Sequence, residues 1–211
     1  MNGIWILLLL ILTAALPAII AFFWFRSRKS AVTLPWFLAS LSAGIISFVI
    51  AALIQDLFIP FRQEKPEALF FSIFIRIALV EEASRLVTLI PFRKARKNLN
   101  NANRAFGAAL GLAAGLGFAV IESAFHGITD LNIAVLRAFT AAPLHGACGI
   151  RAGAAVFAVD QYPAKGIRLF ISTVLIHGAY NLIIVSPAIP SALAIFVALT
   201  ALFSSLIYIK E

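Results

Sequence analysis

The stretch ALVEEASRLVTLIPF, residues 78–92, has the character of a membrane-spanning helix, yet Glu81, Glu82 and Arg85 lie near its middle. A single charge at the centre of such a helix costs about 2.5–3.5 kcal/mol on scales derived from membrane insertion. Three charges within five residues are costly enough to predict that the chain uses them for a function.

The composition around this stretch is that of a membrane protein. The chain has 211 residues, of which 62% are hydrophobic and 12% are charged, whereas soluble domains carry about 25% charged residues. Long apolar runs repeat from end to end, so we predict an all-α polytopic membrane helix bundle. A β-barrel would show short alternating segments instead. We expect residues 1–211 to form a single integral-membrane domain, because no long linker or internal repeat divides them.

Seven membrane spans fit the apolar runs. The first lacks the positive start of a secretory signal, so we expect it to be a retained span. The segments RSRKS, FRKARKNLNNANR and DQYPAKGIR are basic, and they alternate with the nearly neutral segments PFRQEKPE, HGITDLN and SPAIP. This alternation predicts an outward N-terminus and a cytoplasmic C-terminus. The predicted spans are residues 3–25, 34–59, 67–91, 105–126, 132–159, 167–186 and 190–209.

The net charge of +8 comes from lysines and arginines that cluster at span ends. We interpret them as topology signals and predict no nucleic-acid partner. The single cysteine, Cys148, excludes an intrachain disulfide, and we expect it to be a small packing residue. The small residues Gly107, Gly111 and Gly115 recur at helical spacing in the fourth span and predict tight packing near the bundle centre.

A short set of polar residues lies inside the predicted spans, away from their ends. At about 1.5 Å per residue, their positions along the helices let them converge on one site between the midplane and the outer leaflet. Other polar residues, including Asp56, Arg137 and His126, are close enough to a boundary to reach water. Arg76 and Arg151 are deeper, and the sequence gives them no role. The candidate site residues are Glu81, Glu82, Arg85, Glu122, His145, His177 and Asn181.

These residue types favour hydrolysis by water. A carboxylate in a low-dielectric cavity can accept a proton from water, and a histidine can share that task. The side chains of His177 and Asn181 are four residues apart, so both can donate to a developing oxyanion. No serine or cysteine nucleophile has an obvious base beside it. We therefore predict that Glu81 or Glu82 activates water and that Arg85 holds the glutamate pair.

A metal ion is a second possibility for the same site. Glu122, His145 and His177 form a set of two histidines and one carboxylate, which suits a catalytic zinc with one open position. The sequence has no HExxH motif. Zinc-dependent and metal-free hydrolysis both remain open at this point.

Four motifs in chain order, EEASR, GLGFAVIES, PLHGACGIRAG and HGAYN, extend over residues 78–182. Together they resemble the PrsW family of bacterial intramembrane proteases. That family is related to the CAAX proteases and bacteriocin-processing peptidases, whose motifs are EExxxR, FxxxH and HxxxN/D. The resemblance implies that Glu81 activates water, that His177 and Asn181 bind the oxyanion, and that Glu122 and His145 assist. Arg85 lies one residue closer to the glutamate pair than in EExxxR.

The resemblance also implies a substrate and a location. PrsW-like proteases are implicated in site-1 cleavage of membrane-anchored anti-sigma factors. The expected partner is therefore a single-pass membrane protein or peptide within the lipid bilayer of the bacterial cytoplasmic membrane. One alternative is a CAAX-type or bacteriocin-processing peptidase. An alternative from another class is a proton-coupled transporter, which requires a polar path to both faces of the membrane.

Overall fold

The computed structural model describes residues 3–28, 30–57, 66–96, 103–128, 131–186, 188–190 and 192–210. Within these residues the chain forms helices joined by turns and short connections, with no strand, which confirms the predicted all-helical class. The helices are α1 (Gly3–Ser27), α2 (Leu34–Leu57), α3 (Pro66–Phe71), the π-helix η1 (Ser72–Leu79), α4 (Val80–Ala95), α5 (Asn103–Gly127), α6 (Leu131–Phe139), α7 (Ala141–Ala158), α8 (Pro163–Val185), α9 (Ala192–Ser205) and α10 (Ile207–Lys210).

Five helical segments in the described part of the chain are long and apolar enough to cross a membrane. The other two predicted spans fall on η1 with α4, which have 8 and 16 residues, and on α6 with α7, which have 9 and 18 residues. Each of these predicted spans is divided into shorter helices, and none of these helices is among the five. The chain is therefore a membrane protein, while the count of seven spans and the orientation of the termini stay predictions. The five segments are Leu8–Ser27, Leu34–Leu57, Arg104–Gly127, Pro163–Val185 and Ala192–Lys210.

The third predicted span, 67–91, is helical but not uniform. Its middle forms the π-helix η1, and regular α-helix begins again at Val80, directly before the two glutamates. A π-helical turn holds more residues than an α-helical turn, so it changes the direction in which the following side chains point. The direction of Glu81 and Glu82 thus depends on a local feature that an apolar pattern does not reveal.

The fifth predicted span, 132–159, is wrong as a single helix. The structure divides it at Thr140 into α6 and α7. Pro143 has no backbone N–H to donate to the carbonyl of Phe139, and its ring crowds that carbonyl, so a continuous helix is broken one turn before the proline. The backbone N–H of Thr140 instead bonds the carbonyl of Arg137, at 3.3 Å. The seventh predicted span, 190–209, likewise ends in a turn at Leu206 followed by the short α10.

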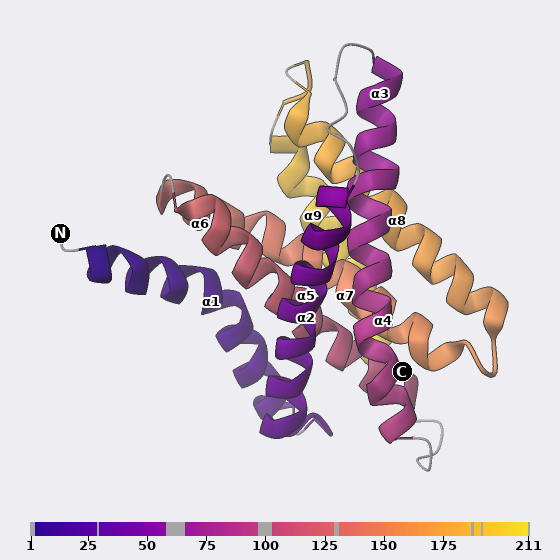
Figure 1. Cartoon of the computed structure of the whole chain (residues 1–211). Coiled ribbons are helices and arrows are strands. Elements are labelled where there is room, and N and C mark those ends of the chain that lie inside the picture. Colours follow the sequence, from indigo (N-terminus) through magenta and orange to yellow (C-terminus); the bar gives the residue numbers. More distant parts are fainter. Residues whose placement is uncertain are drawn as a thin grey trace.

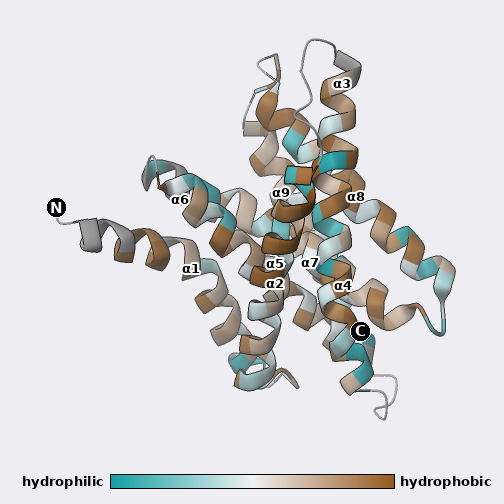
Figure 2. Ribbon diagram, in the orientation of Figure 1, coloured by the Kyte–Doolittle hydropathy of each residue, from teal (hydrophilic) through white to brown (hydrophobic). Residues whose placement is uncertain are grey.

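Helix α5 forms the centre of the bundle. In the membrane-length window of α5, 78% of the residues are buried, against 28% for α1 and for α8. Helices α1, α2 and α7 pack around it, and Figure 1 shows the N-terminal part of α1 leaning away from the rest. Figure 2 shows hydrophobic residues along much of α1 and α2, and hydrophilic residues at the lower end of the bundle as well as on α6 and in the upper part. The site residues carried by α5 and α7 are consequently held in the interior.

Glycines allow α5 and α7 to approach until their backbones touch. A Cβ added to Gly111 would lie 2.0 Å from the carbonyl oxygen of Gly149, and one added to Gly149 would lie 2.1 Å from that of Gly111. Gly107 and Gly153 form a similar pair one turn away. Apolar side chains gain little from contacting each other rather than lipid, so close backbone packing of this kind is a main source of helix association in membranes. The predicted small-residue contact at the bundle centre is confirmed.

Candidate active site

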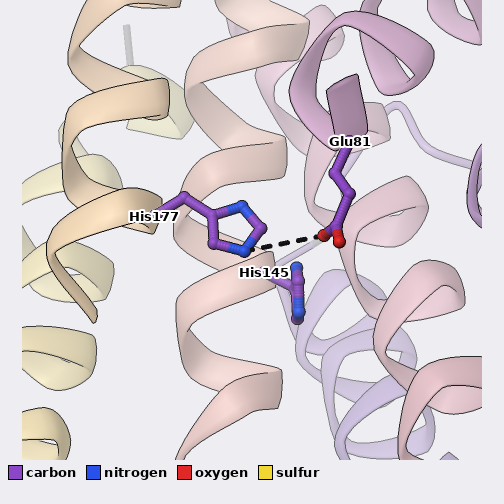
Figure 3. Close-up of side chains that lie close together, drawn as sticks. All are labelled: Glu81, His145 and His177. Carbon is purple, nitrogen blue, oxygen red and sulfur yellow. Dashed lines mark ion pairs between the residues drawn. The ribbon is translucent and has the colours of Figure 1, made fainter. Parts of the chain in front are cut away.

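The structure brings candidate residues from four helices into one buried cluster. Glu81 and Glu82 lie at the start of α4, with Arg85 one turn later. Figure 3 shows Glu81, His145 and His177 with their polar ends directed toward one another. The cluster consists of Glu81, Glu82 and Arg85 from α4, Glu122 from α5, His145 from α7 and His177 from α8.

Both glutamates on α4 are buried although they are neighbours in sequence. Adjacent residues of an α-helix point about 100° apart, and α4 packs against α2 as well as against α7 and α8. Glu81 accordingly contacts Gln55 of α2 and His177, whereas Glu82 contacts Arg85 and His177. The two carboxylates are only 7% and 0% exposed, and their different neighbours give them different roles.

Both carboxylate oxygens of Glu82 have a partner. One carboxylate oxygen pairs with Nη1 of Arg85, and the other lies 2.7 Å from Nδ1 of His177. A carboxylate paired with arginine is an acceptor, so the Nδ1 of His177 carries the proton and donates it to Glu82. The remaining lone pair of neutral His177, on Nε2, then faces the carboxylate of Glu81. This carboxylate–histidine arrangement is the one that orients histidines which bind metals.

His145 is oriented in the same way from the other side. Its Nε2 lies 2.7 Å from a carboxylate oxygen of Glu122, and its Nδ1 lies 3.2 Å from Nη2 of Arg85. Arginine only donates, so Nδ1 of His145 accepts and Nε2–H donates to Glu122. The carboxylate of Glu122 is also paired with Arg137. The ring of Phe118 lies 4.9 Å from that of His145 and 4.7 Å from the guanidinium carbon of Arg85, which holds both groups in place.

Glu81 has a buried carboxylate oxygen that lacks a hydrogen-bond partner among the described residues. Its Oε1 accepts from Nε2 of Gln55 at 3.2 Å. Its Oε2 is buried without a hydrogen-bond partner among the described residues, and it lies 3.6 Å from Nε2 of His177. Two lone pairs that face each other repel unless a proton, a water or a cation lies between them. The geometry at this point therefore calls for a donor or a positive ion.

The donor set fits a metal ion, with one change to the predicted ligands. Among the described residues, ligand atoms of Glu81, His145 and His177 lie within 4.8 Å of one another. Glu122, the predicted carboxylate ligand, is not in this group; its Oε2 contacts Nε2 of His145 and the guanidinium of Arg137. The two-histidine, one-carboxylate composition is kept, with Glu81 in place of Glu122.

The charge of the cluster also favours a cation. Glu81, Glu82 and Glu122 bring three carboxylates, while Arg85 and Arg137 bring two guanidinium groups. Buried charges inside a membrane bundle are normally compensated. One negative charge therefore remains for a proton or a metal ion to neutralise. A second group, Glu82 with Cys148 and His177, is geometrically close as well, but Glu82 already has both oxygens occupied.

The residues that support the cluster from outside were not predicted from the sequence. Gln55, which donates to Glu81, lies next to Asp56 at the end of α2, where a polar residue looks like a normal helix end. The backbone carbonyl of Gln55 accepts a hydrogen bond from Nη2 of Arg76 at 3.1 Å, so Arg76 connects η1 to the end of α2. Arg137 was expected to reach water at a boundary, and it instead pairs with Glu122. Gln55 and Arg137 lie near predicted span ends and on other helices than their partners, so the sequence does not indicate these contacts.

The other singled-out polar residues lie outside the cluster. Arg151 donates to the hydroxyl groups of Ser172, Ser204 and Ser205, at 2.9 to 3.2 Å, and so ties α7 to α8 and α9. His126 is exposed at the end of α5, at the rim of the cluster, where its Nε2 lies 3.9 Å from Oε1 of Glu122. Asn181 lies one turn after His177 on α8, half-buried, and its side chain makes no hydrogen bond within the described residues. Its predicted role at an oxyanion stays a prediction.

Comparison with known proteins bears on this geometry. A sequence model described as the PrsW family intramembrane metalloprotease matches residues 32–208, which includes every residue of the cluster. The match confirms the resemblance seen in the motifs. No curated protein and no solved structure matches the chain.

Proposed function

Because the chain belongs to the PrsW family and is therefore an intramembrane protease, we propose that it cleaves a membrane-anchored protein at the cluster around Glu81. One observation carries this assignment. Oε2 of Glu81 and Nε2 of His177 face each other at 3.6 Å in the interior, and Oε2 lacks a hydrogen-bond partner among the described residues. A water molecule can donate to this oxygen, and a carboxylate so placed is a suitable proton acceptor.

In this proposal Glu81 contacts the attacking water and accepts its proton. Gln55 holds Oε1, so Oε2 remains directed toward the histidines. Glu82 and Arg85 orient His177, and Glu122 with Arg137 orients His145. Burial of the whole cluster limits competing water and strengthens each of these interactions.

A metal ion fits the same site, and the family description names one. His145, His177 and Glu81 would hold it, because their ligand atoms lie within 4.8 Å of one another. When bound, a divalent ion such as Zn²⁺ would supply Lewis acidity toward water and the scissile carbonyl. Arg85 keeps its ion pair with Glu82 in either state.

We assign the oxyanion to Asn181 rather than to His177. The Nδ1–H of His177 is already used by Glu82, and its Nε2 is a lone pair toward Glu81. The carboxamide of Asn181 is one turn away on the same helix and has no hydrogen-bond partner among the described residues. An amide N–H in that position can stabilise a developing negative charge.

The proposed substrate is a single-pass membrane protein such as an anti-sigma factor, cleaved in site-1 fashion in the bacterial cytoplasmic membrane. We further propose seven spans with the N-terminus outside, with η1–α4 and α7 as the two spans that carry the polar site. The alternating basic and neutral connections support this orientation, and it places the start of α4 toward the outer half of the membrane.

The test is cleavage of a single-pass anti-sigma factor by the purified chain in detergent. Glu81→Gln and His177→Ala should each lower turnover by at least about 100-fold, the scale of losing an acid–base group, and both should stay folded. Arg168→Gln, which changes an exposed residue in the first turns of α8, should cleave normally. Full turnover by Glu81→Gln would reject the assignment.

A further inference from the structure

A second site lies far from the cluster, at the basic end of the bundle. A cavity of about 420 Å³ is enclosed by the end of α1 and the turn after it, by the first turns of α5, and by α10. Ala109 lines this cavity, while Glu122 of the cluster lies thirteen residues further along α5. At about 1.5 Å per residue that separation is about 20 Å. The cavity is therefore independent of the active site.

The cavity walls combine apolar and basic groups. Trp24, Phe25 and Phe106 provide aromatic surface, and the two charged residues in the lining, Arg28 and Lys210, are both basic. The guanidinium of Arg28 lies 5.5 Å from the ring centre of Trp24, which fixes it at the rim of the aromatic wall. This composition suits a ligand that is apolar over most of its length and anionic at one end.

The surroundings reinforce the positive charge. Arg96 lies over the ring of Phe106, with its guanidinium carbon 3.3 Å from the ring centre. The first turn of α5 lines the cavity, so the positive end of that helix dipole adds to the field. Among the described residues at this end of the helices, the acidic one is Asp160, and it is paired with Arg93 at 3.1 Å. None of the described residues that line the cavity is acidic.

The neighbouring surface explains where an amphiphile would come from. The last turns of α1 present Ile20 and Phe23 to the outside, 60% and 64% exposed, as expected of side chains that face lipid tails. Trp24 lies at the point where these apolar residues give way to Arg26 and Arg28, which is the usual depth of aromatic residues at a membrane interface. A lipid can thus reach the cavity from the bilayer with its headgroup at the level of the basic residues.

We propose that this cavity binds the phosphate headgroup and glycerol region of an anionic phospholipid. Arg28 and Lys210 contact the phosphate, and the aromatic wall covers the apolar part. Basic pockets between helices at a membrane surface bind lipids in this manner. A free phosphate compound would use the same two cations but would leave the apolar wall unfilled, and the experiment separates these sources.

The experiment is a lipid titration of the full chain in non-ionic detergent, followed by native mass spectrometry. Phosphatidylglycerol should bind more tightly than phosphatidylcholine. Each basic residue near an anionic headgroup contributes about fivefold, so Arg28→Gln with Lys210→Gln should weaken binding about 25-fold. The matched pair Lys94→Gln with Arg168→Gln removes the same charge from exposed positions outside the cavity and should bind as the unmodified chain does.

A second variant tests the apolar wall without changing charge. Ala105→Phe places a ring in the cavity and should weaken lipid binding to a similar extent. Glycerol 3-phosphate should not displace the lipid. Equal binding of the two phospholipids, an equal loss in the matched pair, or displacement by glycerol 3-phosphate would overturn the proposal. None of these outcomes depends on proteolysis.

Discussion

Glu81 and Glu82 are neighbours on α4, yet their carboxylates differ in how many of their oxygens have a hydrogen-bond partner. Both oxygens of Glu82 are occupied, by Arg85 and by His177. Glu81 has one oxygen held by Gln55 and one without a hydrogen-bond partner among the described residues. A carboxylate that orients others needs all its partners, whereas one that meets a water or an ion must keep an oxygen available. The geometry thus supports Glu81 as the reacting residue.

This difference predicts opposite effects of two isosteric substitutions on stability. Glu82→Gln removes one member of a fully buried ion pair and leaves Arg85 uncompensated, so the free energy of unfolding should fall by about 3–5 kcal/mol. In chelator-treated protein, Glu81→Gln removes a buried carboxylate that has no arginine partner among the described residues and keeps an oxygen for Gln55, so the change should be within about 1 kcal/mol. Unfolding titrations of both variants in the same detergent measure this. Equal losses would show that the two carboxylates share one role.

At the scale of helices, the contact between α5 and α7 sets the positions of Glu122 and His145. Gly111 and Gly149 face each other with backbone against backbone, so neither has room for a methyl group. Gly146, on the same helix as Gly149, is different because the nearest atom to an added Cβ is Cδ1 of Leu112, at 3.0 Å. A flexible side-chain end can move, and a backbone carbonyl in a packed helix cannot.

Two alanine substitutions distinguish these environments. Gly111→Ala should lower the free energy of unfolding by about 2–3 kcal/mol, the cost of overpacking a rigid contact. Gly146→Ala should change it by less than about 1 kcal/mol, because alanine's better helix propensity offsets a small movement of Leu112. Denaturation in detergent measures both. A tolerated Gly111→Ala would contradict the backbone contact between α5 and α7.

The helices also show what the sequence could and could not predict. Charged residues and histidines stand out in apolar spans because burying them is costly, so six residues of the cluster could be found from the sequence alone. The sequence could not decide whether Glu81 or Glu122 is the carboxylate near the two histidines, because that depends on how one helix is rotated against another. That rotation follows from the π-helix before α4 and from the break at Thr140, and neither changes the apolar pattern.

At the scale of the whole molecule, the two ends of the bundle differ in charge. The described ends of α1, α4, α8 and α10 that meet the basic connections carry arginines and lysines, and the hydrophilic residues at the lower end of Figure 2 reflect this. Partners that connect the ends to the site, such as Gln55 and Arg137, could not be predicted, because their contacts join helices far apart in the sequence. The proposed orientation of the bundle rests on this difference in charge.

This orientation predicts which positions react with a membrane-impermeant maleimide on intact cells. In a Cys148→Ala background, Ala188→Cys lies in the connection between α8 and α9 and should be labelled, whereas Lys94→Cys should react only after the cells are permeabilised. The unmodified chain should stay unlabelled, since Cys148 is buried. The reverse pattern would place the N-terminus inside.

The most direct test of the active-site account is the metal content of the purified chain. Elemental analysis should find a tightly bound divalent ion in the unmodified protein and in the control Arg168→Gln, and should find little in His145→Ala, His177→Ala or Glu81→Gln, with all variants folded. Chelation should remove both the ion and the cleavage activity, and added Zn²⁺ should restore them. Full cleavage activity in any of the three site variants, or metal retained in all of them, would contradict the account.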